Sequence, residues 1–482
     1  MVIESYDQHY TPDIEPVLLE EARTVRAVSQ VCQLWRDVSF GCHRIWGTIS
    51  NVDSSSTFWI RELLQRSSSA TLAIQSKSRK TPKAPRSFDP PQWTLISEQT
   101  HRFRKLNLTL QTHDFYTSLP IFGRPAPLLE SLVLKFDQNR GSYHSLHRDF
   151  SSNFSSTRLF AGIAPKLRTL TLEKILLLWS PADRMAQNIV RLDLSISQTD
   201  MALFSFESFM EMALPNLQEL VVTGNGKCFR FLSLVIPSSC MITLSFTQRD
   251  ADSAPSNNPL LWVEQYLCRW QAREPLIHSW YLSSTEDGAL ALHAGTKDDP
   301  PDCPQFVLEY NGAEDTAEIR LFYLLKVLRE GVLRESSAMT LDLQSRRYST
   351  VLARKLAELF SQCAILETIT LLRRSIENTL LPVFIKYPEA MANLRHLIID
   401  GPYPASASSI GRVKDLMQHV QFLESMGRKL HKISVCVDDL GKYECFNQGV
   451  ADLAEVVDYL PLRPRVVRRG ELTPRGCWSL GP

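Results

Sequence analysis

Few residues of this 482-residue chain have types and spacing suited to chemistry, and the clearest group could hold a metal ion. His144, His147 and Asp149 lie close together in the sequence, and imidazole and carboxylate groups are common ligands of zinc and related metals. They fall in a Ser- and Asn-rich stretch, which is typical of a loop and would not fix their geometry. Aspartates within 297–304 could attract a cation weakly, but the neighbouring prolines favour an ordinary exposed loop. We therefore expect no metal site.

The chain also lacks the short motifs that build a catalytic centre or a cofactor site. It has no G-x-S-x-G, G-x-G-x-x-G, P-loop, H-E-x-x-H or paired C-x-x-C. Segment 224–228 is too short to cradle a phosphate, and we interpret it as a turn after a strand. Cys32 is expected to be buried in helix packing, which disfavours a reactive thiolate. The sequence predicts a protein that is not an enzyme and needs no cofactor. The alternative is an α/β enzyme whose catalytic residues are distant in the sequence and come together only in the fold.

Composition narrows the class of protein further. The 53 Lys and Arg residues balance 52 Asp and Glu residues, and a net charge of +1 gives no electrostatic reason to expect nucleic-acid binding. No apolar run approaches the roughly 20 residues that span a bilayer, and the first residues do not resemble a secretory signal. Ten cysteines without regular spacing agree with a reducing compartment. We expect a globular protein of the cytoplasm or nucleus, with no membrane or nucleic-acid partner.

One recurring pattern indicates how the elements of the chain are arranged. Segments 127–134, 165–172 and 215–222 each have the form Pro-x-Leu-x-x-Leu-x-Leu or Val, and 393–399 lacks only the proline. The alternation places the last two apolar residues on one face of a strand, and the proline ends any helix before it. Looser copies occur at 103–108, 189–194, 241–246, 277–282, 303–308, 338–343, 366–371 and 430–435. Each of these carries little weight alone, because 44% of the chain is hydrophobic.

Stretches with helical spacing lie between several of these strands. They are 204–214, 262–270, 352–363 and 413–420. Helix and strand alternating at intervals of about 22–38 residues favour an α/β solenoid with a curved parallel sheet over a closed, doubly wound α/β domain. The pattern resembles the leucine-rich repeat, L-x-x-L-x-L-x-x-N/C-x-L. Only Asn225 and Asn311 occupy its asparagine position, so we expect an irregular arc without a continuous asparagine ladder.

The segment 25–50 is the most informative part of the chain. An apolar stripe at helical spacing consists of Val28, Val31, Cys32, Trp35 and Val38. Gly41 is expected to end this helix, and Trp46 with its neighbour Ile45 supplies a second apolar anchor. A further helix is predicted over 57–66, capped by Ser55 or Ser56, followed by a strand over 71–75.

This order of elements over residues 23–75 resembles the second half of an F-box, and especially the F-box proteins with degenerate leucine-rich repeats that are abundant in mushroom-forming fungi. The F-box is a three-helix module that docks on the Skp-family adaptor of a cullin ubiquitin ligase. On this resemblance the second helix and closing anchor correspond to Val28, Val31, Cys32, Trp35 and Trp46. The sequence departs from the family at the N-terminal side, because 11–25 has only weak similarity to the first F-box helix.

The resemblance implies a substrate-recognition adaptor of a Skp-cullin-F-box ubiquitin ligase, whose repeats hold a protein substrate. The expected organisation is a degenerate or truncated F-box start at 1–22, an F-box-like helical segment and first strand at 23–75, a basic Pro-rich linker or loop at 76–91, an irregular leucine-rich-repeat solenoid at 92–460 and a disordered tail at 461–482. The positions flanking the strand leucines are expected to face the substrate. They are Glu130, Arg168, Thr171, Gln218, Glu219, Arg395 and His396. The alternative is a repeat scaffold that binds proteins without recruiting a ligase.

Overall fold

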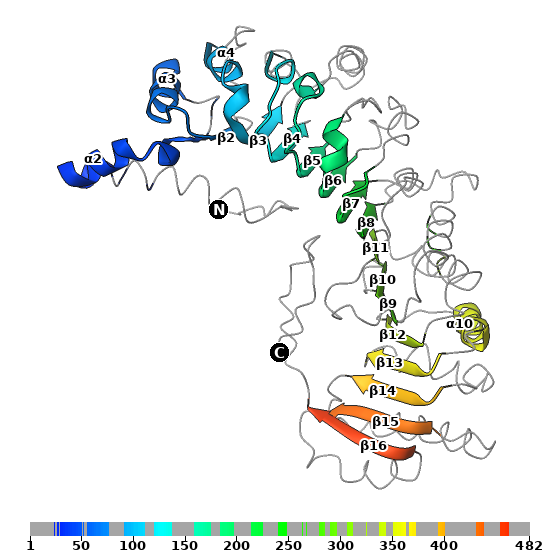
Figure 1. The fold of residues 1–482 in the computed structure, drawn as a ribbon. Helices are drawn as coiled ribbons and strands as arrows, with labels where there is room; N and C mark the ends of the chain where they lie inside the picture. Colours follow the sequence, from blue (N-terminus) through cyan, green and yellow to red (C-terminus); the bar gives the residue numbers. More distant parts are fainter. Residues whose placement is uncertain are drawn as a thin grey trace, which may run out of the picture. The chain divides into compact units, whose positions relative to one another are not determined.

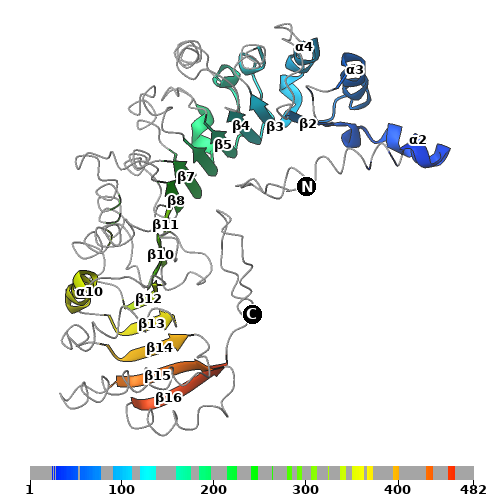
Figure 2. The same ribbon diagram turned by 180° about the vertical axis from the view of Figure 1, so that it is seen from behind.

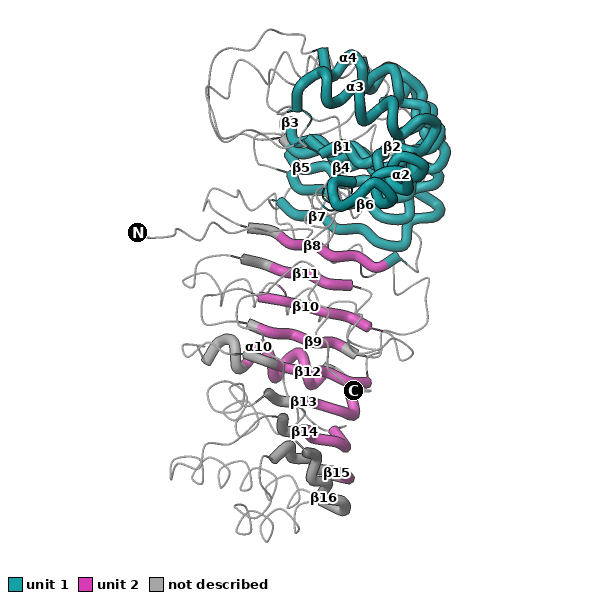
Figure 3. Tube along the Cα trace, turned by 90° about the vertical axis from the view of Figure 1, so that its left-hand side faces the viewer, with its two compact units in different colours: residues 1–240 teal, residues 241–482 magenta. Residues whose placement is uncertain are grey.

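The computed structural model of the chain is a mixed α/β structure with a mostly parallel sheet and few helices. It forms two compact units, residues 1–240 and 241–482 (Figure 3). The structure describes residues 24, 27, 29–50, 52, 55–76, 91–110, 120–136, 159–174, 184–196, 214–224, 240–247, 263, 267, 279–284, 290–295, 306–311, 324, 337–343, 350–362, 366–372, 394–400, 430–437 and 454–461.

The first unit begins with short helices and continues as a series of parallel strands (Figure 1). Its helical elements are α2 (Gln33–Gly41), η1 (His43–Trp46), α3 (Thr57–Arg66), α4 (Pro91–Ser97), η3 (Thr100–Arg102), η4 (Leu159–Gly162) and η5 (Arg184–Asn188). Its strands are β1 (Thr48–Ser50), β2 (Leu72–Ser76), β3 (Phe103–Leu110), β4 (Ser131–Phe136), β5 (Thr169–Glu173), β6 (Arg191–Ser195) and β7 (Glu219–Gly224). Each strand pairs in parallel with the next one along the chain.

The repeated leucines of this unit form the buried side of its sheet. Leu132, Leu170, Leu192 and Leu220 are register partners across β4 to β7, as are Leu134, Leu172, Leu194 and Val222. All eight are buried, together with the apolar residues that precede the strands, Leu129, Leu167, Ile189 and Leu217. The two-residue period of a strand places each pair of leucines on one face, and parallel register stacks them into continuous rows. Helices α3 and α4 lie together on one side of β1–β3 (Figures 1 and 2) and bury Ile60, Leu63, Trp93 and Ile96.

The second unit combines parallel strands with an antiparallel insertion. Its elements are β8 (Met241–Thr247), β9 (Ser279–Ser284), β10 (Leu290–Gly295), β11 (Phe306–Asn311), β12 (Ala338–Leu343), α10 (Thr350–Gln362), β13 (Thr368–Leu372), β14 (His396–Asp400), β15 (Leu430–Val437) and β16 (Ala454–Pro461). Strands β12 to β16 pair in parallel in chain order. Between β8 and β12 the order is β11, β10, β9, and β10 is antiparallel to both of its neighbours.

The expectation of an entirely parallel sheet is therefore wrong for this segment. Only residues 285–289 join β9 to β10, and 296–305 join β10 to β11. A connection as short as the first suits a hairpin, whereas a parallel crossover needs a dozen or more residues. Strand β10 itself has no counterpart among the predicted segments, whereas the strands predicted from both the close and the loose copies of the repeat are present.

The predicted helices have mixed outcomes. Helix α3 has the predicted bounds, and the Ser56 side chain accepts a hydrogen bond from the Trp59 N–H at 3.2 Å. Helix α10 matches the predicted 352–363 and buries Leu356, Leu359 and Phe360. Within 262–270 the described residues Val263 and Leu267 are helical and buried. Most of 204–214 and all of 413–420 lie outside the described residues, as do the basic segment 77–90 and the tail 462–482.

His293 of β10 makes the stability of the second unit depend on pH. Its ring lies 5.2 Å from that of its register partner Tyr281, and burial lowers the pKa of His293 to about 4. The unfolded chain takes up this proton near pH 6.5, so stability that is complete above pH 6.5 is lost as the pH falls towards 4. We expect a loss on the order of 2 kcal/mol between pH 7 and pH 4, measured by urea unfolding. His293→Gln should remove this component, and an unchanged pH dependence in that variant would contradict the assignment.

Candidate functional site

A buried tryptophan organises the N-terminal helices. Trp46 is only 2% exposed, and its indole N–H donates to the Ser39 backbone oxygen at 2.7 Å. Its ring lies 5.8 Å from that of Phe40. The Arg66 guanidinium stacks 4.6 Å from the Trp46 ring centroid and 4.7 Å from that of Phe40. Trp46 thus holds the end of α2 against η1 and the last turn of α3.

Arg66 links these elements through polar contacts as well. Its Nε donates to Glu62 Oε1 at 2.8 Å, one helical turn earlier on α3. The Arg66 backbone oxygen bonds to the Nδ1 of His43 at 2.9 Å. The small module of α2, η1 and α3 is therefore fixed by stacking, by an ion pair and by backbone hydrogen bonds.

In contrast to this core, helix α2 presents apolar side chains to solvent. We define the α2 apolar face as Leu34, Trp35 and Val38, which share one side of the helix at i, i+4 and i+3 spacings. Their exposed fractions are 71%, 51% and 56%. Val31, a helical residue on the other side of Cys32, is also exposed. Isolated exposed hydrophobic residues are ordinary, whereas a contiguous set on one helix makes α2 a candidate interaction surface.

The prediction for Cys32 is wrong. Helix α2 begins at Gln33, and Cys32 is its N-cap with an extended backbone, so the predicted stripe is interrupted there. Cys32 is exposed because neither the helix it precedes nor any other described element packs over it. Val28, the remaining predicted member of the stripe, lies outside the described residues.

A second surface lies at the starts of β4 to β7, where one residue directly precedes each strand. These residues are Glu130, Arg168, Val190 and Gln218. The backbone oxygens of the first three each accept two N–H groups from the start of the next strand, at 2.8–3.1 Å. This repeated pair of hydrogen bonds fixes the distance between neighbouring strand starts, as the inter-strand hydrogen bonds do within a parallel sheet.

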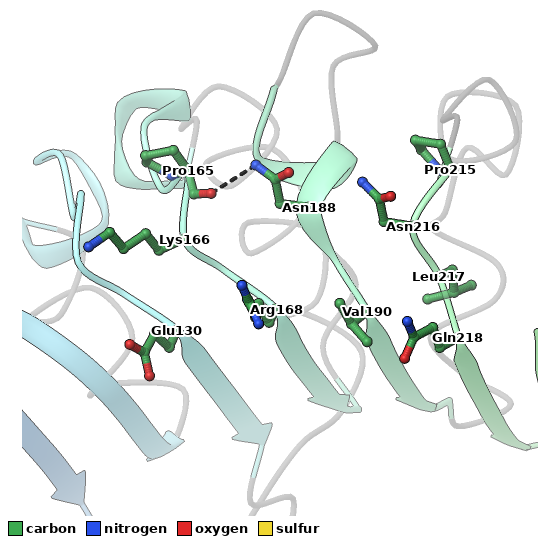
Figure 4. Close-up of a pocket in the computed structure, with 10 residues that line it drawn as sticks. All are labelled: Glu130, Pro165, Lys166, Arg168, Asn188, Val190, Pro215, Asn216, Leu217 and Gln218. Carbon is green, nitrogen blue, oxygen red and sulfur yellow. Dashed lines mark hydrogen bonds between the residues drawn. The ribbon is translucent and has the colours of Figure 1, made fainter.

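The residues of this row line a depression of about 800 Å³, which we term the strand-start depression (Figure 4). Its lining consists of Glu130, Pro165, Lys166, Arg168, Asn188, Val190, Pro215, Asn216, Leu217 and Gln218. Figure 4 shows Glu130, Lys166 and Arg168 at one end and Gln218 at the other. Three of the seven predicted substrate-facing residues, Glu130, Arg168 and Gln218, thus border one surface.

Two asparagines brace the strand-start depression, and sequence analysis did not single them out. Asn188 Nδ2 donates to the Pro165 oxygen at 2.8 Å, and Asn216 Nδ2 donates to the Gln187 oxygen at 2.7 Å. Each asparagine precedes the first buried apolar residue of its repeat and reaches back to the repeat before. Aligning 187–194 with 215–222 would have shown the two asparagines at the same place, where 165–172 has Lys166.

The other predicted substrate-facing residues do not join this depression. Thr171 is buried in β5, between two leucine positions. The Glu219 carboxylate is paired with Arg191 at 2.7 Å. In the second unit, Arg395 lies 3.8 Å from Glu367, and its neighbour His396 begins β14.

The sheet side opposite the leucines carries charges around one half-buried carboxyl group. Burial raises the pKa of Asp193 on β6, and the Arg191 guanidinium opposes that rise. Besides the Arg191 and Glu219 pair, Lys135 and Glu173 lie 3.6 Å apart on β4 and β5. Arg191 and Lys135 thus partly offset the negative charge of this group of carboxylates.

The described residues contain no group of three or more His, Cys, Asp or Glu side chains placed to hold a metal ion. The sequence candidates His144, His147 and Asp149 lie outside those residues. Burial raises the pKa of the Cys240 thiol to about 12, so this cysteine stays protonated and unreactive near neutral pH. Among the residues that the structure describes, no helix is long and apolar enough to cross a membrane.

A scan against protein-family models finds no match, and a search of curated proteins finds no similar sequence.

Proposed function

We propose that the protein is a substrate-recognition adaptor of a Skp-cullin-F-box ubiquitin ligase. The observation that carries this proposal is the α2 apolar face. It stands exposed on a module whose own core is already closed around Trp46, so its side chains are available for a partner. In the F-box resemblance, this is the helix that docks on the Skp-family adaptor.

The parallel strands support the second half of the proposal. Strands β1 to β7 follow one another in chain order, with buried leucines at equivalent places, as expected for an irregular leucine-rich-repeat solenoid. A solenoid offers an extended row of repeated positions to a protein substrate. Holding that substrate near the ubiquitin-loaded enzyme would raise its effective concentration there.

The test is co-expression of the full chain with a Skp-family adaptor, followed by affinity capture and size-exclusion chromatography. We expect one-to-one co-elution, and at least a roughly tenfold loss of affinity for Trp35→Ala, because exposed tryptophans at interfaces often dominate binding. Phe58→Ala is the matched control. Phe58 on α3 is 73% exposed and lies outside the α2 apolar face, so its loss should leave adaptor binding unchanged.

Circular dichroism of each variant separates lost binding from lost folding. Equal affinities for wild type, Trp35→Ala and Phe58→Ala would show that the α2 apolar face is not the docking surface. Failure of the folded wild type to bind any adaptor would favour the alternative, a repeat scaffold that does not recruit a ligase.

A further inference from the structure

The strand-start depression has the size and the stability of a peptide-binding site. Its volume of about 800 Å³ lies within the range typical of ligand pockets. Its backbone is held by the double hydrogen bonds of Glu130, Arg168 and Val190 and braced by Asn188 and Asn216. A surface fixed in this way loses little conformational entropy when a ligand binds.

Its charges favour an anionic ligand. Lys166 and Arg168 are both exposed, and among the described residues neither has a carboxylate within ion-pair distance. The only carboxylate of the lining, Glu130, is already paired with Arg104 at 2.8 Å. Two uncompensated cations therefore stand beside one compensated anion. The guanidinium of Arg168 can bind a carboxylate through two parallel hydrogen bonds.

The remaining lining suits a peptide better than a nucleic acid. The half-buried Val190 contributes apolar surface, and the exposed Gln218 amide can donate to or accept from a peptide backbone. Two cations in a chain of net charge +1 neutralise too few phosphates for stable nucleic-acid binding.

We infer that the strand-start depression binds an acidic segment of a partner protein, with Arg168 and Lys166 contacting its carboxylates. This inference rests on the proposed role of the repeats in holding a substrate and adds the chemical class of the segment that they recognise.

The experiment measures fluorescence anisotropy of the full chain, without adaptor, titrated into a fluorescein-labelled peptide of alternating Glu and Gly. We expect this peptide to bind about tenfold more tightly than its Gln-Gly counterpart. Arg168→Gln and Lys166→Gln should each weaken binding about five- to tenfold. Glu130→Gln should strengthen it about twofold, because Arg104 then loses its partner and the site becomes more positive. All three side chains are exposed or half-exposed, so the folded state should tolerate these changes.

Arg395→Gln is the matched control. Arg395 occupies the same position in its repeat as Arg168, directly before β14, and its side chain is 72% exposed. We expect less than a twofold effect. Equal losses for Arg168→Gln and Arg395→Gln would overturn the inference, as would no measurable binding of the Glu-Gly peptide to wild type. Tighter binding of a dT oligonucleotide with the same dependence on Arg168 would assign the surface to nucleic acid and also overturn it.

Adaptor binding distinguishes this inference from the ligase proposal. Arg168→Gln should co-elute with the Skp-family adaptor as wild type does, because the α2 apolar face is unchanged. Selective peptide binding without adaptor binding would leave the strand-start depression as a recognition site of a scaffold protein. Adaptor binding without peptide selectivity would retain the ligase role and refute the acidic-segment inference.

Discussion

Replacing Trp46 with alanine is expected to lower the free energy of unfolding of the first unit by about 3–5 kcal/mol. The indole is buried, donates to the Ser39 oxygen and stacks on Arg66, so its removal leaves a cavity and removes the shorter of two hydrogen bonds that this oxygen accepts. Arg66 at the end of α3 also loses one stacking partner, while its ion pair with Glu62 and its contact with Phe40 remain. Urea unfolding followed by circular dichroism measures the change.

Trp35→Ala provides the control within the same module. Trp35 is the same residue type on the same small module, but it is 51% exposed, so its removal should change stability by less than about 1 kcal/mol. The two variants should therefore separate folding from binding: Trp46→Ala destabilises the fold, and Trp35→Ala weakens adaptor binding. Equal destabilisation by both substitutions would mean that the α2 apolar face is covered within the protein and is not free to bind a partner.

Arg102→Ala is expected to lower stability by about 3 kcal/mol, because this residue is 7% exposed and its guanidinium makes three hydrogen bonds. Arg102 donates to the Ala70 oxygen at 2.9 Å, to Gln99 Oε1 at 3.0 Å and to Ser67 Oγ at 2.7 Å. These bonds tie the residues that follow α3 to the start of β3. Burial lowers the pKa of Arg102, yet the guanidinium stays charged because arginine remains protonated in proteins.

Thermal unfolding of Arg102→Ala, Arg102→Lys and Arg104→Ala tests this assignment. Lysine supplies the positive charge but not the several N–H donors of a planar guanidinium. Arg102→Lys should therefore be nearly as unstable as Arg102→Ala. The exposed Arg104 pairs with Glu130, and its removal should cost less than about 1 kcal/mol. Recovery of full stability by Arg102→Lys would show that charge, and not hydrogen-bond geometry, explains the role of Arg102.

The strands of the sheet could be predicted largely from the sequence, but their order could not. Segment 165–172 carries its own strand signal, because a two-residue apolar period and a leading proline are local properties. The insertion of β10 between β9 and β11 depends on pairing between distant segments, which a periodic pattern does not encode. The same pattern overlooked β10, whose Leu290, Leu292 and Ala294 alternate but are preceded by Asp287 where the repeat has an apolar residue.

The two surfaces were predictable to different degrees. Periodicity predicted one face for Val31, Trp35 and Val38, but it could not show that the helix is interrupted at Cys32 or whether another element covers that face. For this reason the prediction that Cys32 is buried failed. Arg102 gave no signal, because a charged residue is ordinarily exposed and its acceptors come from residues 67–70 and 99.

The reversed order of β9 to β11 also bears on how the second unit is made during translation. In the first unit every new strand can pair with the strand synthesised just before it. Strand β8 ends at Thr247, whereas its partner β11 begins only at Phe306. At the usual rate of about 5–20 residues per second, the ribosome needs roughly 3–12 s to supply that partner. During this interval one edge of β8 lacks its native neighbour, and an unpaired strand edge can pair wrongly with another chain.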